Sequence, residues 1–256
     1  MQPVDPDMTA RPVFVLSEAY EAFDGPWHTH RRAQFVYASS GVLTTRTANG
    51  LWVVPPHRAV WIPPNEPHKG SANRAFMLRT LYAEPGVAPV PPTCRVVSVD
   101  PLLDALLAEV ATFGPDYPED GPEQRLVQVV LDRLARLAVV PSHLPLPSDP
   151  RLLHLTSALE AHPADPRPLD ALAADSGMTG RTAARLFAKE TGLTFSQWRQ
   201  QLRLLKALQR LCAGDSVTHA AAEVGYGDVS AFIAVFKEAF GETPARYIRA
   251  GRDKAG

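Results

Sequence analysis

Three histidines and a glutamine near the start of the chain have types and spacing that could hold a metal ion. His28 and His30 are two residues apart, Gln34 follows His30 by four residues, and His68 follows the proline-rich residues 61–67. On a β-strand, residues two apart project from the same face, so His28 and His30 would point together. Three imidazoles and one oxygen donor suit zinc, nickel, iron or manganese. The same side chains could instead line a polar pocket.

Short strands separated by turns are predicted to position these side chains. Runs rich in β-branched and aromatic residues occupy residues 33–38, 41–47, 51–54, 59–62 and 75–82. Asn49-Gly50, between two of these runs, is a strong hairpin-turn dipeptide. Many short strands with frequent turn signals predict an antiparallel sandwich or barrel.

Two helices are predicted after the strands, because apolar residues recur at helical spacing over residues 102–110 and 126–137. We expect the first helix to pack within its own domain. The second helix lies next to a proline-rich stretch and is the better candidate for contact with a second copy of the chain.

Proline and charge divide the 256 residues into two parts. Residues 1–150 contain 21 of the 25 prolines and a net charge of −4, whereas residues 151–256 carry +3. Because proline is excluded from helix interiors, the second part should be mostly helical. We therefore expect a first domain over residues 1–140, an extended linker over 141–150, and a second domain over 151–256.

The composition also limits the classes to which the chain can belong. No apolar run reaches the 18 or more residues of a membrane-spanning helix, and no signal peptide is recognisable. Two cysteines are too few for a disulfide framework. These features predict a protein of the cytoplasm with no membrane partner.

The first part resembles the cupin superfamily, whose first motif matches His28, His30, Gln34 and Gly41 and whose second ends at His68. The resemblance implies a β-barrel and, in its metal-binding members, a divalent metal held by His28, His30, Gln34 and His68. Gln34 departs from the usual glutamate. Many cupin-like sensor domains instead bind an organic ligand, so a metal, a small molecule or a ligand-free dimerisation barrel all remain open. Some nearby aromatic residues should line the pocket and others the core: Trp27, Phe35, Tyr37, Trp52 and Trp61.

A helix, a glycine turn and a second helix with a polar face are predicted over residues 168–192. The first helix begins at Leu169, Gly177 permits the tight turn, and Thr179 caps the second helix. The same order returns 48 positions later at Gly225, where a helix after Asp228 buries phenylalanines. Each unit is a helix-turn-helix pattern, and an amphipathic segment over residues 195–211 joins the two.

This pair of units closely resembles the AraC/XylS family of transcriptional regulators. Residues 172–179, 185–192, 203–207 and 225–247 carry the resemblance. It implies an all-α DNA-binding domain behind a cupin-like barrel and two helices, an α+β fold as a whole. The second helix of each unit would enter the major groove, with the pair about one DNA turn, roughly 34 Å, apart.

By position in the two reading helices, ten residues are the predicted contacts with double-stranded promoter DNA. They are Gly180, Arg181, Thr182, Arg185 and Lys189 in the first unit, and Asp228, Ser230, Ala231, Ala234 and Lys237 in the second. Arg181 and Arg185 are one turn apart and could pair with guanine. Lys189, Lys237, Arg203 and Arg246 are expected at phosphates or in solvent. Since Ala234 stands where the family often has arginine, the first unit should dominate base readout.

The leading hypothesis is therefore a DNA-binding regulator, not an enzyme, whose barrel senses a small molecule or metal. A homodimer is expected, with RNA polymerase as a partner if the protein activates; sequence does not decide between activator and repressor. The alternative is a metal-dependent cupin enzyme, for which two helix-turn-helix units have no evident use. A charge of +3 is modest, so specific contacts and a second protomer should matter more than general attraction to phosphate.

Overall fold

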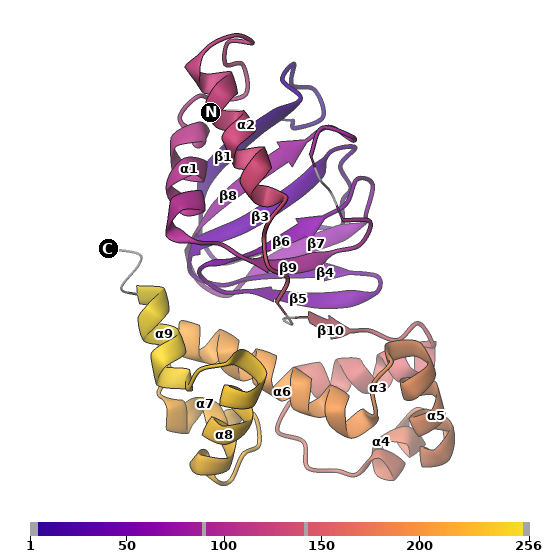
Figure 1. The fold of residues 1–256 in the computed structure, drawn as a ribbon. Helices are drawn as coiled ribbons and strands as arrows, with labels where there is room; N and C mark the ends of the chain where they lie inside the picture. Colours follow the sequence, from indigo (N-terminus) through magenta and orange to yellow (C-terminus); the bar gives the residue numbers. More distant parts are fainter. Residues whose placement is uncertain (1–4, 89–90, 141–142, 253–256) are drawn as a thin grey trace. The chain divides into compact units, whose positions relative to one another are not determined.

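Antiparallel strands and two helices form the first part of the computed structural model, which describes residues 5–88, 91–140 and 143–252 (Figure 1). The strands are β1 (Val13–Tyr20), β2 (Phe23–Asp24), β3 (Ala33–Ser40), β4 (Leu43–Thr47), β5 (Gly50–Val54), β6 (Arg58–Ile62), β7 (His68–Ala72), β8 (Phe76–Ala83), β9 (Arg95–Ser98) and β10 (His143–Pro145). They make two five-stranded sheets with the orders β1-β8-β3-β6-β9 and β10-β5-β4-β7-β2. The antiparallel fold expected from the sequence is confirmed, and its strands lie in two sheets.

The five predicted runs correspond to β3, β4, β5, β6 and β8, and the Asn49-Gly50 turn joins β4 to β5. Gly41 makes the turn between β3 and β4 with a φ of 75°, and a Cβ there would lie 2.6 Å from the Cβ of Phe76. Both the backbone conformation and the space therefore require glycine at this turn.

Alternation along β3 separates two parts of the core. Phe35 and Tyr37 belong to a buried cluster that includes both helices of this unit. Val36 and Ala38 belong to a second cluster, which contains residues from both sheets. Because successive side chains point to opposite faces of a strand, Gln34 lies on the Val36 face, toward the space between the sheets.

Helices α1 (Pro101–Ala111) and α2 (Pro122–Leu134) lie side by side over one sheet (Figure 1). Asp100 caps α1 by accepting a hydrogen bond from the backbone N–H of Leu103 at 2.8 Å. Most of both apolar stripes is buried in the same cluster as β1, β3 and β8, whereas Leu102 is exposed. The apolar stripe of α2 therefore packs within its own domain, through Val127, Val130, Leu131 and Leu134, and contact of this helix with a second copy stays a prediction for its outer face.

Seven helices follow: α3 (Pro150–Ala161), α4 (Leu169–Asp175), α5 (Gly180–Thr191), α6 (Phe195–Cys212), α7 (Val217–Glu223), α8 (Val229–Phe240) and α9 (Pro244–Arg252). Ala48–Leu51 groups with His143–Arg252 in one compact unit, and the other described residues form the second. No described helix is long and apolar enough to cross a membrane.

The extended linker expected over residues 141–150 is described from His143 on; Pro141 and Ser142 lie outside the described residues. Strand β10 and the first residue of α3 both fall within residues 143–150. Leu144 and Leu146 are buried there, and the backbone N–H of Leu146 donates to the carbonyl of Asn49 at 3.0 Å. Apolar burial and backbone pairing thus hold in place a stretch that its prolines predicted to be extended.

Candidate functional sites

His28, His30 and His68 come together in the first unit. His28 and His68 form an isolated antiparallel bridge, with reciprocal backbone hydrogen bonds of 2.9 and 3.0 Å. Their rings are 4.3 Å apart, and the His30 ring lies 5.0 Å from His28 and 5.8 Å from His68. One ring nitrogen of each lies within 4.8 Å of the others. The prediction that these histidines converge is confirmed, although a single bridge replaces the expected strand at His28.

Backbone carbonyls fix which ring nitrogen carries the proton in two of these histidines. Nδ1 of His28 lies 3.0 Å from the carbonyl oxygen of Pro26, and Nδ1 of His68 lies 2.8 Å from that of Glu66. A carbonyl only accepts, so Nδ1 must donate and the lone pair is left on Nε2. Metal-binding histidines are held in this way, with the second nitrogen donating to an oxygen. The residues present therefore fit a divalent metal.

Burial lowers the pKa of two histidines of this cluster, His30 and His68. Removal from water lowers the pKa of His68 to about 4. Burial, and then the neighbouring His28, lower the pKa of His30 below its usual value. Since a metal binds neutral imidazole, both rings are ready to act as ligands at neutral pH.

Gln34, the fourth predicted ligand, is buried on β3, and its Oε1 has no hydrogen-bond partner among the described residues. It pairs across the sheet with Tyr82, whose ring contacts the ring of His30 edge-on at 5.6 Å. Gln34 thus neighbours a residue that contacts the cluster. A buried amide oxygen without a partner is costly, which is consistent with a ligand at this position.

The five aromatic residues predicted near the histidines differ in their burial. Four are buried in the two core clusters: Phe35, Tyr37, Trp52 and Trp61. Trp27, which precedes the first histidine of the cluster, is 51% exposed. It is the member of the predicted aromatic set whose ring is accessible to a ligand from outside.

A stripe of unpaired cations defines the outer face of α5, the second helix of the first helix-turn-helix unit. Ala183, Leu186 and Phe187 are buried on its inner face. Three other residues are exposed one turn apart, and none of them has an ion pair or hydrogen bond within residues 143–252: Arg181, Arg185 and Lys189. Cations free of internal partners can bind phosphates or base edges. Contact of these three residues with DNA stays a prediction.

Gly180 and Thr182 have internal roles at the start of α5. A Cβ on Gly180 would lie 1.6 Å from Oδ1 of Asp170 on α4, so glycine lets the two helices approach. The hydroxyl of Thr182 lies 3.0 Å from that of Thr179, the residue that caps α5. Neither observation excludes a contact with DNA.

The outer face of α8, in the second unit, is mostly uncharged. Phe232 and Phe236 are buried inward, whereas four other residues are exposed: Ser230, Ala231, Ala234 and Lys237. The Asp228 side chain accepts from the backbone N–H of Ser230 at 2.8 Å and so caps the helix. Small side chains here allow close approach but offer few hydrogen bonds.

Arg203 on α6 is a structural residue, contrary to its expected place at a phosphate or in solvent. Its guanidinium donates to the carbonyl oxygens of Pro163 at 2.9 Å and Asp165 at 3.2 Å. A Cβ at Gly225, in the turn of the second unit, would lie 3.0 Å from the same group. Arg203 therefore connects the linking helix to both the loop before α4 and this turn.

Residues 143–149 are fastened to the first helix-turn-helix unit, an attachment that the sequence did not reveal. Trp198 on α6 donates to the carbonyl of Pro145 at 2.7 Å. Glu190, near the end of α5, accepts from the backbone N–H groups of Ser148 at 2.7 Å and Asp149 at 3.0 Å. Glu190 thus binds the residues at which α3 begins. The signal that was available is Asp149-Pro150, a typical helix start.

Both parts of the chain match known protein families. Residues 11–173 match the AraC-like ligand binding domain, and residues 172–250 match a helix-turn-helix domain. The HTH-type transcriptional regulator NimR of Escherichia coli is 36% identical over 92% of this chain and 86% of its own length. The activator RhaS of Escherichia fergusonii is 40% identical over 41% of this chain and 38% of its own. ToxT from Vibrio cholerae covers 94% of this chain and 96% of its own, with 8% identity and a TM-score of 0.40.

Proposed function

This chain belongs to the AraC family of transcriptional regulators, and from that premise we propose that it binds specific promoter DNA under the control of a metal ion or small molecule. It has a helix-turn-helix domain for DNA and an AraC-like ligand binding domain. The family consists of regulators, so the alternative of a metal-dependent cupin enzyme is set aside. A promoter-binding protein acts where the chromosome lies, which we take to be the cytoplasm.

The observation that carries the DNA-binding proposal is the free cation stripe of α5. Arg181 and Arg185 are exposed and have no partner among the described residues, so they are available for bidentate pairing with guanine in the major groove. Lys189, one turn further on, is placed for a phosphate. On α8, Ala231 and Ala234 offer apolar contact with thymine methyl groups, and Lys237 offers a phosphate contact. We propose that the first unit supplies most of the base recognition.

The observation that carries the sensing proposal is the histidine cluster. His28, His30 and His68 would hold a divalent metal, with Gln34 as the nearby oxygen donor. Zinc, nickel, iron and manganese all accept such a donor set. A bound metal would supply a Lewis-acid centre for the heteroatom of an effector. Binding shifts promoter occupancy only by the difference in its affinity for two conformations.

We expect the purified protein to bind one of these metals at the cluster. Isothermal titration with Zn²⁺ and Ni²⁺ should show binding that His68→Ala weakens by at least about 10²-fold, since losing an outer partner alone costs 10–100-fold. His154→Ala, an exposed histidine on α3, is the matched control and should bind as wild type. Footprinting of the promoter with and without metal then shows whether occupancy responds. If the wild type binds no metal, the sensed ligand is an organic molecule, or the first domain binds no ligand at all.

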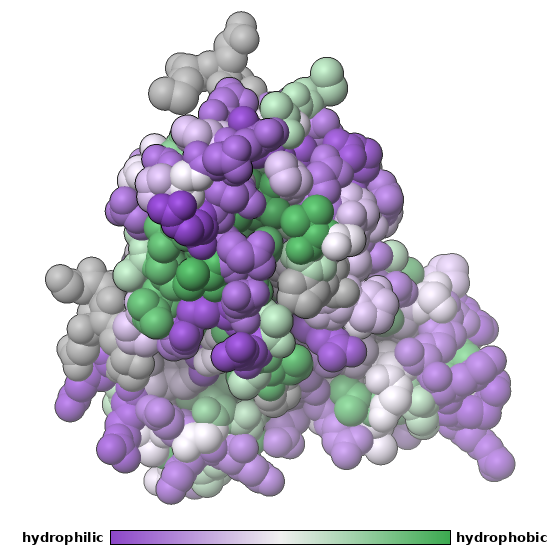
Figure 2. All heavy atoms as spheres, turned by 45° about the horizontal axis from the view of Figure 1, so that its top comes forward, coloured by the Kyte–Doolittle hydropathy of each residue, from purple (hydrophilic) through white to green (hydrophobic). Residues whose placement is uncertain are grey.

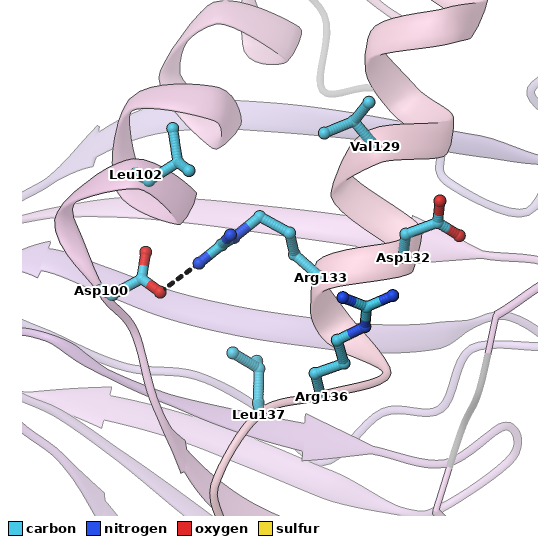
Figure 3. A pocket seen from close by; sticks show the side chains of 7 residues that line it. All are labelled: Asp100, Leu102, Val129, Asp132, Arg133, Arg136 and Leu137. Atoms are coloured by element: carbon cyan, nitrogen blue, oxygen red, sulfur yellow. Dashed lines mark hydrogen bonds and ion pairs between the residues drawn. The ribbon is translucent and has the colours of Figure 1, made fainter.

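A homodimer is proposed through the outer surface between α1 and α2. This surface has a hollow of about 320 Å³. Figure 3 shows the apolar and charged side chains that line it: Asp100, Leu102, Val129, Asp132, Arg133, Arg136 and Leu137. Leu102 is 54% exposed and Val129 is 45% exposed. The face in Figure 2 likewise carries apolar patches among hydrophilic side chains. Apolar residues with both signs of charge suit a self-complementary, two-fold contact.

Val129→Asp is expected to shift this dimer toward monomer, because it places a carboxylate beside Asp132 in the contact. Sedimentation equilibrium measures the change. Val139→Asp, another exposed valine, is the control and should leave the dimer intact. Unchanged association of the Val129 variant would place the contact elsewhere.

RNA polymerase becomes a further partner if the regulator activates transcription.

A further inference from the structure

The segment before β1 is attached to the residues that directly follow His30. Asp7 accepts hydrogen bonds from the backbone N–H of Arg31, at 3.0 Å to Oδ2, and of Arg32, at 3.4 Å to Oδ1. The Arg31 guanidinium also donates to the backbone carbonyl of Asp7 at 3.3 Å. Asp7 is therefore placed beside a member of the histidine cluster that lies 23 positions away in sequence.

Arg32 secures this attachment independently of the Asp7 side chain. It is 1% exposed, and its guanidinium donates to the carbonyls of Arg11 at 2.6 Å and Thr9 at 2.8 Å. It also pairs with Glu84 at 2.9 Å and lies over the ring of Phe14. A buried guanidinium with several hydrogen bonds holds residues 7–11 in place even when the carboxylate of Asp7 is altered.

Asp7 faces Nδ1 of His30, as backbone carbonyls face Nδ1 of the other two histidines. Nδ1 of His28 and Nδ1 of His68 each face a backbone carbonyl. Nδ1 of His30 faces Oδ2 of Asp7 at 4.0 Å, with the two side chains 17% and 29% exposed. An approach of about 1 Å would make a hydrogen bond. Among the described residues, the three histidines have ligand atoms close enough together to hold one metal ion, and Asp7 does not belong to this set.

We propose that Asp7 is a positioning residue of the metal site, the carboxylate that accepts from Nδ1 of His30 and directs its Nε2 to the metal. The proposal rests on the proposed metal binding at His28, His30 and His68. A carboxylate behind a metal-binding histidine fixes its ring and raises its basicity, and losing such a partner typically lowers metal affinity 10–100-fold. With Asp7 included, every histidine of the cluster has an oxygen facing Nδ1.

Asp7→Asn tests this, because the amide has one oxygen left to accept from the backbone N–H of Arg31 or Arg32 and loses the charge that faces His30. We expect Zn²⁺ affinity, measured by competition with a chromogenic chelator, to fall about 10- to 100-fold. Asp24→Asn is the control: Asp24 is exposed, pairs with Lys69 at 2.9 Å, and should leave the affinity unchanged. Thermal unfolding of both variants checks that residues 7–11 remain attached.

A second measurement needs no metal. In the metal-free wild type, ¹⁵N NMR of the imidazole rings should show His30 with its proton on Nδ1, and Asp7→Asn should shift His30 toward the other tautomer. Wild-type Zn²⁺ affinity in a folded Asp7→Asn protein, or an unchanged His30 tautomer, would overturn the proposal for Asp7 alone. A wild-type protein that binds no Zn²⁺ would overturn the metal site and this proposal with it.

Discussion

Replacing Arg181 and Arg185 together with alanine should weaken specific promoter binding by about 2–6 kcal/mol, because each bidentate arginine contributes about 1–3 kcal/mol. Both side chains are exposed on α5 without internal partners, so their loss should leave the fold intact. Electrophoretic mobility shift at fixed salt measures the effect. Each single variant should also relax base preference at one position of the site.

The control is Arg74→Ala, which removes one exposed cation from the turn between β7 and β8. Arg74→Ala changes the net charge by the same amount as each single variant, but Arg74 lies outside the helix-turn-helix domain. The Arg74→Ala protein should therefore bind the promoter as the wild type does. Lys189→Ala provides a second comparison and should weaken binding to all sequences equally. Promoter binding that survives the double change would show that α5 is not the reading helix.

Trp198→Ala is expected to lower the free energy of unfolding of the carboxy-terminal domain by about 3–5 kcal/mol, the usual cost of removing a buried aromatic side chain. Trp198 is fully buried, and its ring contacts that of Phe187 at 5.7 Å. It also donates the hydrogen bond to Pro145. Its loss should therefore open the α5–α6 core and release β10 together. Urea unfolding followed by circular dichroism measures the change.

Trp198→Phe separates the two contributions, since phenylalanine keeps most of the ring but cannot donate to Pro145. It should cost less than alanine while still freeing residues 143–146 to proteolysis. Trp27→Ala, at a tryptophan 51% exposed, should change stability by no more than about 0.5 kcal/mol. If Trp198→Ala had an equally small effect, the attachment of β10 to α6 would be wrong.

The DNA-binding half could be predicted almost completely because its signals are local. Helical periodicity, the caps Thr179 and Asp228, and the turns at Gly177 and Gly225 each act within a few residues of where they stand. The three histidines could also be predicted to converge, because their types and spacing match a motif. The bridge between His28 and His68 supplied the pairing that spacing alone could only suggest.

The misses are contacts between residues far apart in sequence. Nothing near Asp7 indicates His30, nothing near Arg203 indicates the carbonyl of Pro163, and nothing near Trp198 indicates Pro145. The apolar stripe of α2 could be predicted from the sequence. Helical spacing of apolar residues shows only that one face of a helix is buried, and not which part of the protein covers that face. The prolines of residues 141–150 correctly excluded an internal helix, yet they gave no sign that Leu144 and Leu146 would be buried.

The free cations of the reading helices have a consequence for how the protein finds its site. Each cation that meets a phosphate releases about one condensed counterion, and this release drives nearly all binding to nonspecific DNA. The stripe of α5 has three such cations, and α8 adds Lys237. Four such cations per protomer would give the logarithm of affinity a slope of about −3.6 against the logarithm of salt concentration, so a twofold rise in ionic strength should lower promoter affinity roughly 12-fold. Promoter occupancy should therefore depend on cellular ionic strength as well as on the state of the sensor domain.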